Sequence, residues 1–330
     1  MRNRNDTPSK RRVIDAALDR HANLPSRQLA RMLYKQHREL FPTQDAAYCS
    51  IRYRRGAKGE AFRQKRQTHH AHRRTPCPPI PPSKATAWPT VALPPGRILL
   101  LGDLHFPYHD PAAIDAALCY GEQHKANHIL LNGDTIDFYS CSRFETNPKE
   151  RNLRGELEAA EQFFKHLRHR FPRARIFFKK GNHDERWDSF IWAKAPELWD
   201  LPQMQLENIT NMAAHRIEML PRRARITAHK LNILHGHELD KGFIAPVNPA
   251  RGAFLRSVEC TVVHHFHRTS EHIERSVANK QIACFSAACL CGLWPDYAVA
   301  NKWNHGFALV ENTPTGFTMH NKRIMDGRVL

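Results

Sequence analysis

GDLHFPYHD, residues 102–110, directly follows the aliphatic run from Ile98 to Leu101, and this junction indicates what kind of fold the chain adopts. An aliphatic run that ends in Gly-Asp-x-His is typical of a buried strand with metal ligands at its carboxyl end. Asp103 and His105 are two residues apart, so strand alternation predicts that both side chains point to the same side. The junction therefore predicts a metal site at the end of a buried strand.

The same arrangement, an apolar run followed by Asp, Asn or His, occurs four more times along the chain. The motifs that end these runs are GDTID at residues 133–137, GNHD at 181–184, HGH at 235–237 and HHFH at 264–267. Carboxylate, amide and imidazole groups are all ligands of divalent metals. Five strand-like runs with such endings predict one dinuclear metal site.

The ordered set GDLH, GDTID, GNHD, HGH and HHFH resembles the calcineurin-like metallophosphoesterases, over roughly residues 96 to 310. The resemblance implies two sets of metal ligands that share Asp134 as a bridge. The first set is Asp103, His105, Asp134 and His267, and the second is Asp134, Asn182, His235 and His265. The sequence departs from the family at His264, where a glycine is usual, and we expect a bulky residue there to crowd the second metal.

The types of ligand indicate which metals and which reaction the site supports. Carboxylate, imidazole and amide ligands suit two divalent ions, of which Mn is favoured and Fe, Zn, Ni or Co also fit. Two such ions, about 3.5–4 Å apart, activate a bridging water and hold a phosphoryl group for in-line attack. The resemblance implies that His183 faces the phosphate and the leaving group, and that Asp137 hydrogen-bonds this histidine and fixes its tautomer.

Three further positions bear on the substrate. Phe138 stands where phosphoprotein phosphatases of this superfamily have a phosphate-binding arginine, which argues against a phosphoprotein substrate. Arg186 is a candidate phosphate clamp, and an ion pair with Glu185 or Asp188 is the alternative interpretation. His237 lies close to a predicted ligand, and we expect it beside the metals or on the substrate side rather than bound to a metal.

The composition restricts the class of protein. With 330 residues, of which 41% are hydrophobic, the chain has room for one large domain and a small one. No apolar run approaches the length of a membrane span, and the basic amino terminus lacks the apolar segment of a secretory signal. The eight cysteines form no CxxC pair, which is typical of reduced thiols. We therefore expect a cytoplasmic protein without a membrane partner.

Positive charge is concentrated in the first part of the chain. Residues 1–75 contain 19 Lys and Arg against 6 Asp and Glu, and so carry a net charge of +13 out of +18 for the whole chain. Such a basic block on a nearly balanced body is typical of a module that binds a polyanion, and nucleic acid is the partner that we expect. A solvated, solubilising surface is the alternative.

Capping signals predict three short helices in this basic block. They begin at Ser9, at Pro25-Ser26 and at Pro42-Thr43, and the third ends at Gly56. The arrangement resembles a helix-turn-helix, whose last helix enters the major groove of DNA. The nucleic-acid contacts predicted from it are Arg52, Arg54 and Arg55 on the third helix. A small helical domain that docks on the body or on another protein remains an alternative.

The chain thus divides into a basic helical domain at residues 1–66, a Pro-rich basic linker at 67–95 and a catalytic domain at 96–330. Strands alternate with helices expected at 111–123 and 154–170. This alternation predicts an α/β fold, and the resemblance makes it a metallophosphoesterase-type β-sandwich flanked by helices. The small amino-terminal domain is expected to be all-α.

The function that these features favour is metal-dependent hydrolysis of phosphate esters in nucleic acid, by a nuclease or an end-processing phosphoesterase. Such an architecture fits a phage or mobile-element protein by analogy. The alternative is a phosphatase for small molecules or phosphoproteins, in which the amino-terminal domain serves targeting. A non-catalytic DNA-binding regulator is disfavoured, because every expected ligand position is filled.

Overall fold

The structure is a computed structural model that describes residues 9–56, 79–239, 247–296 and 298–330. The chain forms two compact units, Met1–Ala85 and Thr86–Leu330. The predicted boundary between residues 66 and 67 lies outside the described residues. The second unit includes Thr90–Ala92, which the sequence assigns to the linker and which the structure shows as the edge strand β1.

Within residues 9–56, the first unit contains three helices, as the sequence predicts: α1 (Lys10–Arg20), α2 (Ser26–Gln36) and α3 (Gln44–Arg55). The hydroxyl of Ser9 caps α1, and the hydroxyl of Thr43 caps α3 by accepting the N–H of Ala46 at 3.1 Å. Gly56 ends α3 with a left-handed φ of 94°, a conformation that suits glycine.

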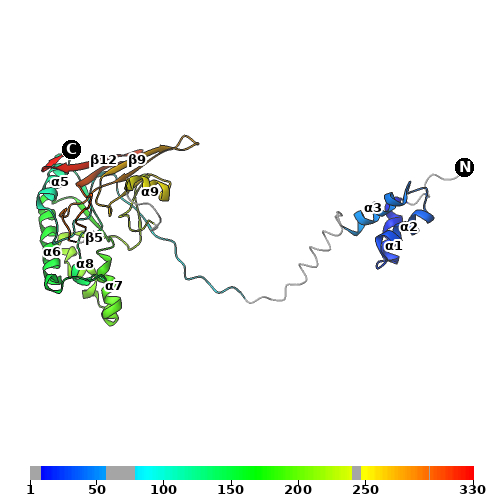
Figure 1. Ribbon diagram of the computed structural model, residues 1–330, viewed down its shortest axis with the longest axis horizontal. Coiled ribbons are helices and arrows are strands. Elements are labelled where there is room, and N and C mark those ends of the chain that lie inside the picture. The colour runs from blue at the N-terminus through cyan, green and yellow to red at the C-terminus, as the bar shows by residue number, and fades with distance from the viewer. Residues whose placement is uncertain (1–8, 57–78, 240–246, 297) are drawn as a thin grey trace. The chain divides into compact units, whose positions relative to one another are not determined.

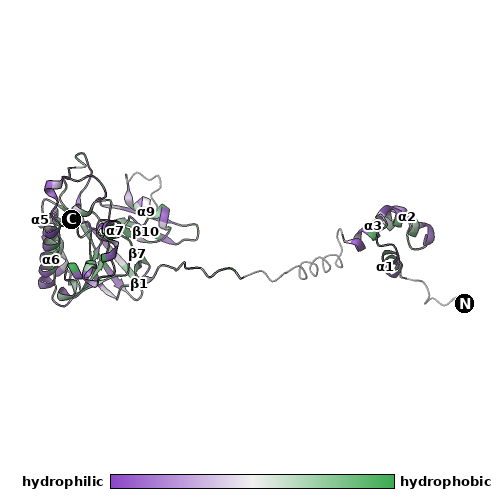
Figure 2. Ribbon diagram, turned by 90° about the horizontal axis from the view of Figure 1, so that it is seen from below, coloured by the Kyte–Doolittle hydropathy of each residue, from purple (hydrophilic) through white to green (hydrophobic). Residues whose placement is uncertain are grey.

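The three helices of this unit pack their apolar faces around a core of their own. In Figure 2 each helix carries both hydrophilic and hydrophobic residues, as an amphipathic helix does. The buried core residues come from all three helices and from the segment before α3: Ile14, Leu29, Ala30, Leu33, Phe41, Ala47 and Ile51. Residues 9–56 of this unit therefore form a small all-α domain with a core of its own.

The second unit contains two mixed sheets. The first has seven strands in the order β13-β12-β11-β2-β3-β4-β5, and β2 to β5 run parallel. Its strands are β2 (Gly96–Leu101), β3 (His128–Asn132), β4 (Arg175–Lys179), β5 (Ile217–Met219), β11 (His305–Thr313), β12 (Gly316–Met325) and β13 (Arg328–Val329). β11 joins β2 in antiparallel fashion and brings the carboxyl-terminal part of the chain into the same sheet.

The second sheet has six strands in the order β1-β6-β7-β8-β10-β9. They are β1 (Thr90–Ala92), β6 (Arg225–Ala228), β7 (Leu231–Ile233), β8 (Thr261–Val263), β9 (Ser270–Arg275) and β10 (Gln281–Ser286). β7, β8 and β10 are parallel neighbours. Their carboxyl ends therefore lie at one edge of this sheet, as those of β2, β3 and β4 do in the other.

The two sheets pack face to face, and helices cover their outer faces. Ile98 and Leu100 of β2 pack between the sheets, whereas Leu99 and Leu101 face the helices. Because both faces of β2 are covered, the strand is a continuous apolar run rather than an alternating one. The body is thus a β-sandwich flanked by helices, as predicted.

Helices α5 (Pro111–Gln123) and α6 (Leu153–Arg170) lie along the seven-stranded sheet, and α9 (Pro249–Ser257) covers the six-stranded sheet (Figure 1). The other helices described in this unit are α7 (Glu185–Lys194), α8 (Leu206–Ile209) and the 3-10 turns Tyr139–Cys141, Pro148–Glu150, Pro196–Leu198, Pro202–Met204 and Met212–His215. Among all helices in the described ranges, none combines the length and apolar character needed to cross a membrane.

The five predicted strands are all present, but Asp103 and His105 do not belong to the first of them. β2 ends at Leu101, and both residues lie beyond it with a left-handed φ of 51°. Strand alternation is therefore the wrong explanation for their shared direction. A left-handed turn after the strand points both side chains toward the site.

The packing between the sheets yields a testable prediction. Leu100 is fully buried there, so Leu100→Ala should lower the free energy of unfolding of the body by about 2–5 kcal/mol. Urea unfolding followed by tryptophan fluorescence isolates this unit, because all six tryptophans lie beyond residue 85. Met325→Ala, at a side chain that is 60% exposed, is the control. Equal unfolding midpoints for both variants would contradict the packing.

Candidate metal centre

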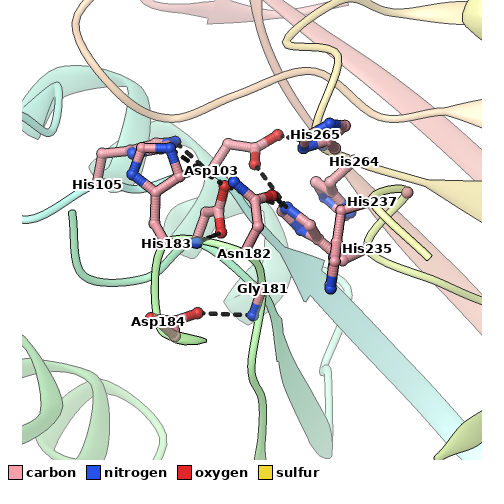
Figure 3. Close-up of polar contacts among 12 residues, drawn as sticks. Asp103, His105, Gly181, Asn182, His183, Asp184, His235, His237, His264 and His265 are labelled. Atoms are coloured by element: carbon pink, nitrogen blue, oxygen red, sulfur yellow. Dashed lines mark hydrogen bonds and ion pairs between the residues drawn. The ribbon is translucent and has the colours of Figure 1, made fainter. Parts of the chain in front are cut away.

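All seven predicted metal ligands lie together at one end of the sandwich. Figure 3 labels five of them, Asp103, His105, Asn182, His235 and His265. Each comes from the segment that follows the carboxyl end of a strand, and the five strands belong to both sheets. The seven are Asp103 and His105 after β2, Asp134 after β3, Asn182 after β4, His235 after β7, and His265 and His267 after β8. The site therefore exists only where the two sheets meet.

The first set of predicted ligands gathers around the Nε2 atom of His105. This atom lies 3.3 Å from Nε2 of His267 and 3.8 Å from Oδ2 of Asp134. Nε2 of His267 is 3.6 Å from Oδ1 of Asp103. Ligand atoms of Asp103, His105 and Asp134 all lie within 4.8 Å of one another, which is close enough for one ion to contact all three.

The second set gathers around the Nε2 atom of His235. This atom lies 3.1 Å from Oδ2 of Asp134 and 3.2 Å from Oδ1 of Asn182. Ligand atoms of Asp134, His235 and His265 lie within 4.8 Å of one another. Asp134 therefore belongs to both sets, and its position is the one that a bridging carboxylate requires.

Hydrogen bonds on the far sides of the imidazole rings orient the rings toward the centre. Nδ1 of His235 lies 2.9 Å from the carbonyl oxygen of Asn132, so this ring holds its proton on Nδ1 and turns Nε2 inward. Nδ1 of His105 lies 2.9 Å from Oδ1 of Asp137, with the same effect. Two ligand histidines are thus fixed in the tautomer that metal binding needs.

The electrostatics of the centre suit a cation. Burial alone would lower the pKa of His235 and of His267, but the carboxylates of Asp134 and Asp103 outweigh it. They raise the pKa of His235 to about 9 and that of His267 to about 10. The buried Oδ1 of Asp103 accepts no hydrogen bond from the described residues. The donor set therefore fits divalent ions, which would satisfy this oxygen and replace the protons on the rings.

His264 does not take part in either ligand group. Its Nδ1 lies 2.8 Å from Nδ2 of Asn132, and burial lowers its pKa to about 4, so the ring is neutral. A Cβ atom at Gly102 would overlap the ring. The side chain that we expected to crowd the second metal thus packs against Gly102 and Asn132.

Asp184 was missed as a functional residue, although it is part of the GNHD motif. Its buried carboxylate accepts the backbone N–H of Gly181 at 2.8 Å, of Ile136 at 3.0 Å and of Thr135 at 3.4 Å. Burial and the nearby carboxylate of Asp134 raise its pKa to about 7. Asp184 therefore ties the loop that carries Asn182 to the loop that carries Asp134.

Lys179 and Glu238 form a buried ion pair that sequence reasoning also missed. Glu238 accepts the backbone N–H of Gly236 at 2.7 Å and that of His235 at 3.3 Å. Burial would raise the pKa of Glu238, but Lys179 outweighs it and holds the carboxylate ionised. Part of this pairing could have been inferred from the sequence, because Lys179 lies three residues before the predicted ligand Asn182 and Glu238 lies three residues after the predicted ligand His235.

Cys291 is a further neighbour of the ligands. Its Sγ lies 4.0 Å from Nδ1 of His267, and ligand atoms of Cys291, His105 and His267 lie within 4.8 Å of one another. Contact with Cys289, together with burial, raises the pKa of the Cys291 thiol well above its usual value. The sulfur is therefore a protonated thiol beside His267, in keeping with a centre made of oxygen and nitrogen ligands.

His183, Asp137 and Arg186 form a hydrogen-bonded group at the edge of the centre. Nδ1 of His183 lies 3.0 Å from Oδ1 of Asp137. Arg186 donates from Nη1 to the carbonyl oxygen of Asp137 at 2.9 Å, and its Nη2 lies 3.0 Å from Nε2 of His183. Glu185 and Asp188, the alternative partners of Arg186, are paired with other cations. Arg186 thus lies beside the nitrogen of His183 that faces away from Asp137.

The three arginines predicted to contact nucleic acid differ in their surroundings. Arg52 is exposed on α3. Arg54 forms an ion pair with Asp15 of α1. Arg55 donates to the hydroxyl of Ser26 at 3.1 Å and to carbonyl oxygens of the α1–α2 connection. Arg54 and Arg55 therefore also hold the three helices together.

The sandwich fold and the set of carboxylate, amide and imidazole donors define a metal-dependent hydrolase. A model of the calcineurin-like phosphoesterase family matches residues 96–287, more than half of the chain. The chain belongs to this family, whose members use divalent metal ions.

Individual proteins with similarity to this chain come from several sources. The Gene 54 protein of Mycobacterium phage L5 is 22% identical over 180 residues, which cover 52% of this chain and 69% of that protein. Vps29 of Entamoeba histolytica complexed with Zn²⁺ is 12% identical, with a TM-score of 0.37 over 71% of this chain and 96% of that one. YfcE, a phosphoesterase from E. coli, is 14% identical, with a TM-score of 0.34 over 68% of this chain and 98% of that one.

The shared position of Asp134 predicts the behaviour of one variant. Asp134→Asn should lose bound metal and hydrolytic activity, because it removes negative charge from both ligand groups at once. Metal content by elemental analysis and far-UV circular dichroism measure the loss and the intact fold. Asp115→Asn, on the surface of α5, is the matched carboxylate control. Two bound metals with full activity in Asp134→Asn would rule out the bridging role.

A second variant separates the metal ligands from the proposed acid. His183→Ala should keep both metals and lose on the order of 10²–10⁴ in rate, the usual contribution of general acid–base catalysis. The backbone N–H of residue 183, which donates to Asp134 at 2.8 Å, is unchanged by this substitution. The rate loss should shrink for substrates whose leaving group needs no proton. Loss of metal from His183→Ala would instead make His183 a ligand.

Proposed function

We propose that this enzyme hydrolyses phosphate esters in nucleic acid, as a nuclease or an end-processing phosphoesterase. The observation that carries the proposal is the presence of a basic three-helix unit and a phosphoesterase body in one chain. Within residues 9–56 there are 11 Lys and Arg against 4 Asp and Glu. A positive field of this kind attracts a polyphosphate backbone without regard to its sequence.

The chemistry follows from the residues at the edge of the centre. Two divalent ions, for which we propose Mn before Fe, Zn, Ni or Co, supply Lewis-acid activation of the attacking water and the phosphoryl group. His183, held by Asp137, serves as general acid toward the leaving oxygen, which requires Nε2, the acceptor for Nη2 of Arg186 in the structure, to take up a proton and turn to the substrate. Arg186, beside the same nitrogen, places a fixed positive charge where the phosphoryl oxygens gather negative charge.

The surroundings of Phe138 support a nucleic acid over a phosphoprotein as the substrate. Phe138 takes the position at which related phosphoprotein phosphatases carry an arginine. Its ring is fully buried and stacks on Trp187 at 6.0 Å between centroids. The position therefore contributes packing to the body and no cation to the substrate.

The amino-terminal surface that we propose for nucleic acid is centred on Tyr48. The guanidinium groups of Arg27, from α2, and Arg52, from α3, lie 5.7 and 5.8 Å from the centroid of this ring. Tyr53 is 58% exposed on the same helix as Arg52. Arg54 and Arg55 extend the basic end of α3. Their side chains are held in place by the hydrogen bonds that Arg54 donates to Asp15 and Arg55 donates to Ser26.

The test compares the full chain with a variant that lacks residues 1–85. This deletion leaves every predicted ligand and strand β1 in place, so turnover of a small chromogenic phosphodiester should be nearly unchanged. Nucleic-acid binding and cleavage at low substrate concentration should fall sharply. Gel-shift and nuclease assays at two salt concentrations measure both effects.

The salt dependence sharpens the test within the full chain. Each phosphate neutralised contributes a slope of about 0.9 log unit in affinity per log unit of salt. Arg52→Ala should therefore lower the slope by about one unit, whereas Arg154→Ala, on the surface of α6, should leave it unchanged. Equal nucleic-acid binding by the full chain and the deletion variant would make the helical unit a docking module and refute its proposed role.

A further inference from the structure

A cavity of about 550 Å³ opens directly beside the second ligand group. Asn182 and His265 form part of its wall, so the cavity is continuous with the predicted metal centre. The walls away from the metals include Arg143 and Phe144 from the segment after β3, together with Arg256 of α9 and Phe266. We call this space the Arg143–Phe144 cavity.

The charge of the cavity favours an anion. Three guanidinium groups line it, from Arg143, Arg186 and Arg256. Its acidic lining residue is Glu185, whose carboxylate lies 3.0 Å from Nε of Arg222 and is thereby neutralised. A ligand with more than one phosphate would therefore place one group at the metals and another among these arginines.

The aromatic side chains of the cavity favour a flat ring beside that anion. Phe144 is 65% exposed, and the guanidinium of Arg143 lies 5.1 Å from the centroid of its ring. An exposed phenyl ring next to an arginine is typical of proteins that stack the bases of single-stranded nucleic acid. A base inside a duplex cannot offer its face in this way, because its neighbours cover it.

We propose that the Arg143–Phe144 cavity binds the nucleotide next to the scissile phosphate in a single-stranded segment. The base stacks on Phe144, and the adjoining phosphate lies between Arg143 and Arg256. The volume agrees with one nucleotide, because cavities of about 300–1,000 Å³ hold ligands of that size. This inference rests on the proposed function and adds to it the form of nucleic acid and the residues that select it.

The test uses two chromogenic diesters that share one leaving group. Thymidine 5′-(4-nitrophenyl phosphate) carries a nucleoside, and methyl 4-nitrophenyl phosphate does not, so the ratio of their kcat/KM values isolates the nucleoside contacts. The full-length protein should prefer the thymidine diester. Phe144→Leu, which keeps an apolar side chain but removes the ring, should lower the ratio by about tenfold, in line with the usual strength of base stacking.

A second measurement does not depend on turnover. Calorimetric titration should show that thymidine 3′,5′-bisphosphate binds more tightly than inorganic phosphate, and that Phe144→Leu and Arg143→Ala each remove most of the difference. Arg154→Ala is the matched control, because its side chain is 88% exposed on α6 and away from the cavity lining. This variant should keep both the ratio and the affinity.

The outcomes separate this inference from the proposed function. Cleavage of oligonucleotides with an unchanged ratio in Phe144→Leu and Arg143→Ala would overturn the cavity assignment alone. A lack of preference for the thymidine diester, as expected for a phosphopeptide site, would overturn it as well. A protein that shows the preference and the tighter bisphosphate binding but leaves oligonucleotides intact would support the cavity and refute the proposed function.

Discussion

The buried ion pair between Lys179 and Glu238 joins the two sheets at the end where the metal ligands lie. Lys179 ends β4, three residues before Asn182, and Glu238 follows β7, three residues after His235. The attraction therefore holds two ligands of one group at a fixed separation, although they belong to different sheets. Two buried charges are favourable only as a pair, since removal of one partner typically costs about 3–5 kcal/mol. The metal centre depends on this ion pair between the sheets, because neither sheet carries a complete ligand group.

The ligand loops are also strained, and the body must compensate for that strain. Five of the seven predicted ligands have left-handed backbone conformations, with φ between 50° and 71°: Asp103, His105, Asp134, His265 and His267. Such conformations cost on the order of 1 kcal/mol or more each in residues other than glycine. The apolar contacts between the sheets stabilise this arrangement. The carboxylate of Asp184 also stabilises it, by accepting hydrogen bonds from two of the loops.

The sequence predicted the strands and the polar motifs at their carboxyl ends, because each apolar run ends in a polar motif that marks its own position. It did not predict the roles of Asp184 and Glu238, which depend on backbone groups from distant segments. The sequence also left the binding partner of Arg186 undecided, because Glu185 and Asp188 are both close to it along the chain. Strand alternation also failed beyond Leu101, where the left-handed turn replaces it.

The separation of the cavity loop from the metal ligands has a consequence for how such enzymes evolve. The segment from Phe138 to Asn152 carries Arg143 and Phe144 but none of the seven predicted ligands, and it is the part of the β3–α6 connection that follows Asp134 and Asp137. Insertions or substitutions there would change the shape of the cavity and leave the hydrolytic apparatus untouched. A lineage with this architecture can therefore exchange one class of phosphate ester for another by altering a single connection, while selection on the metal site stays constant.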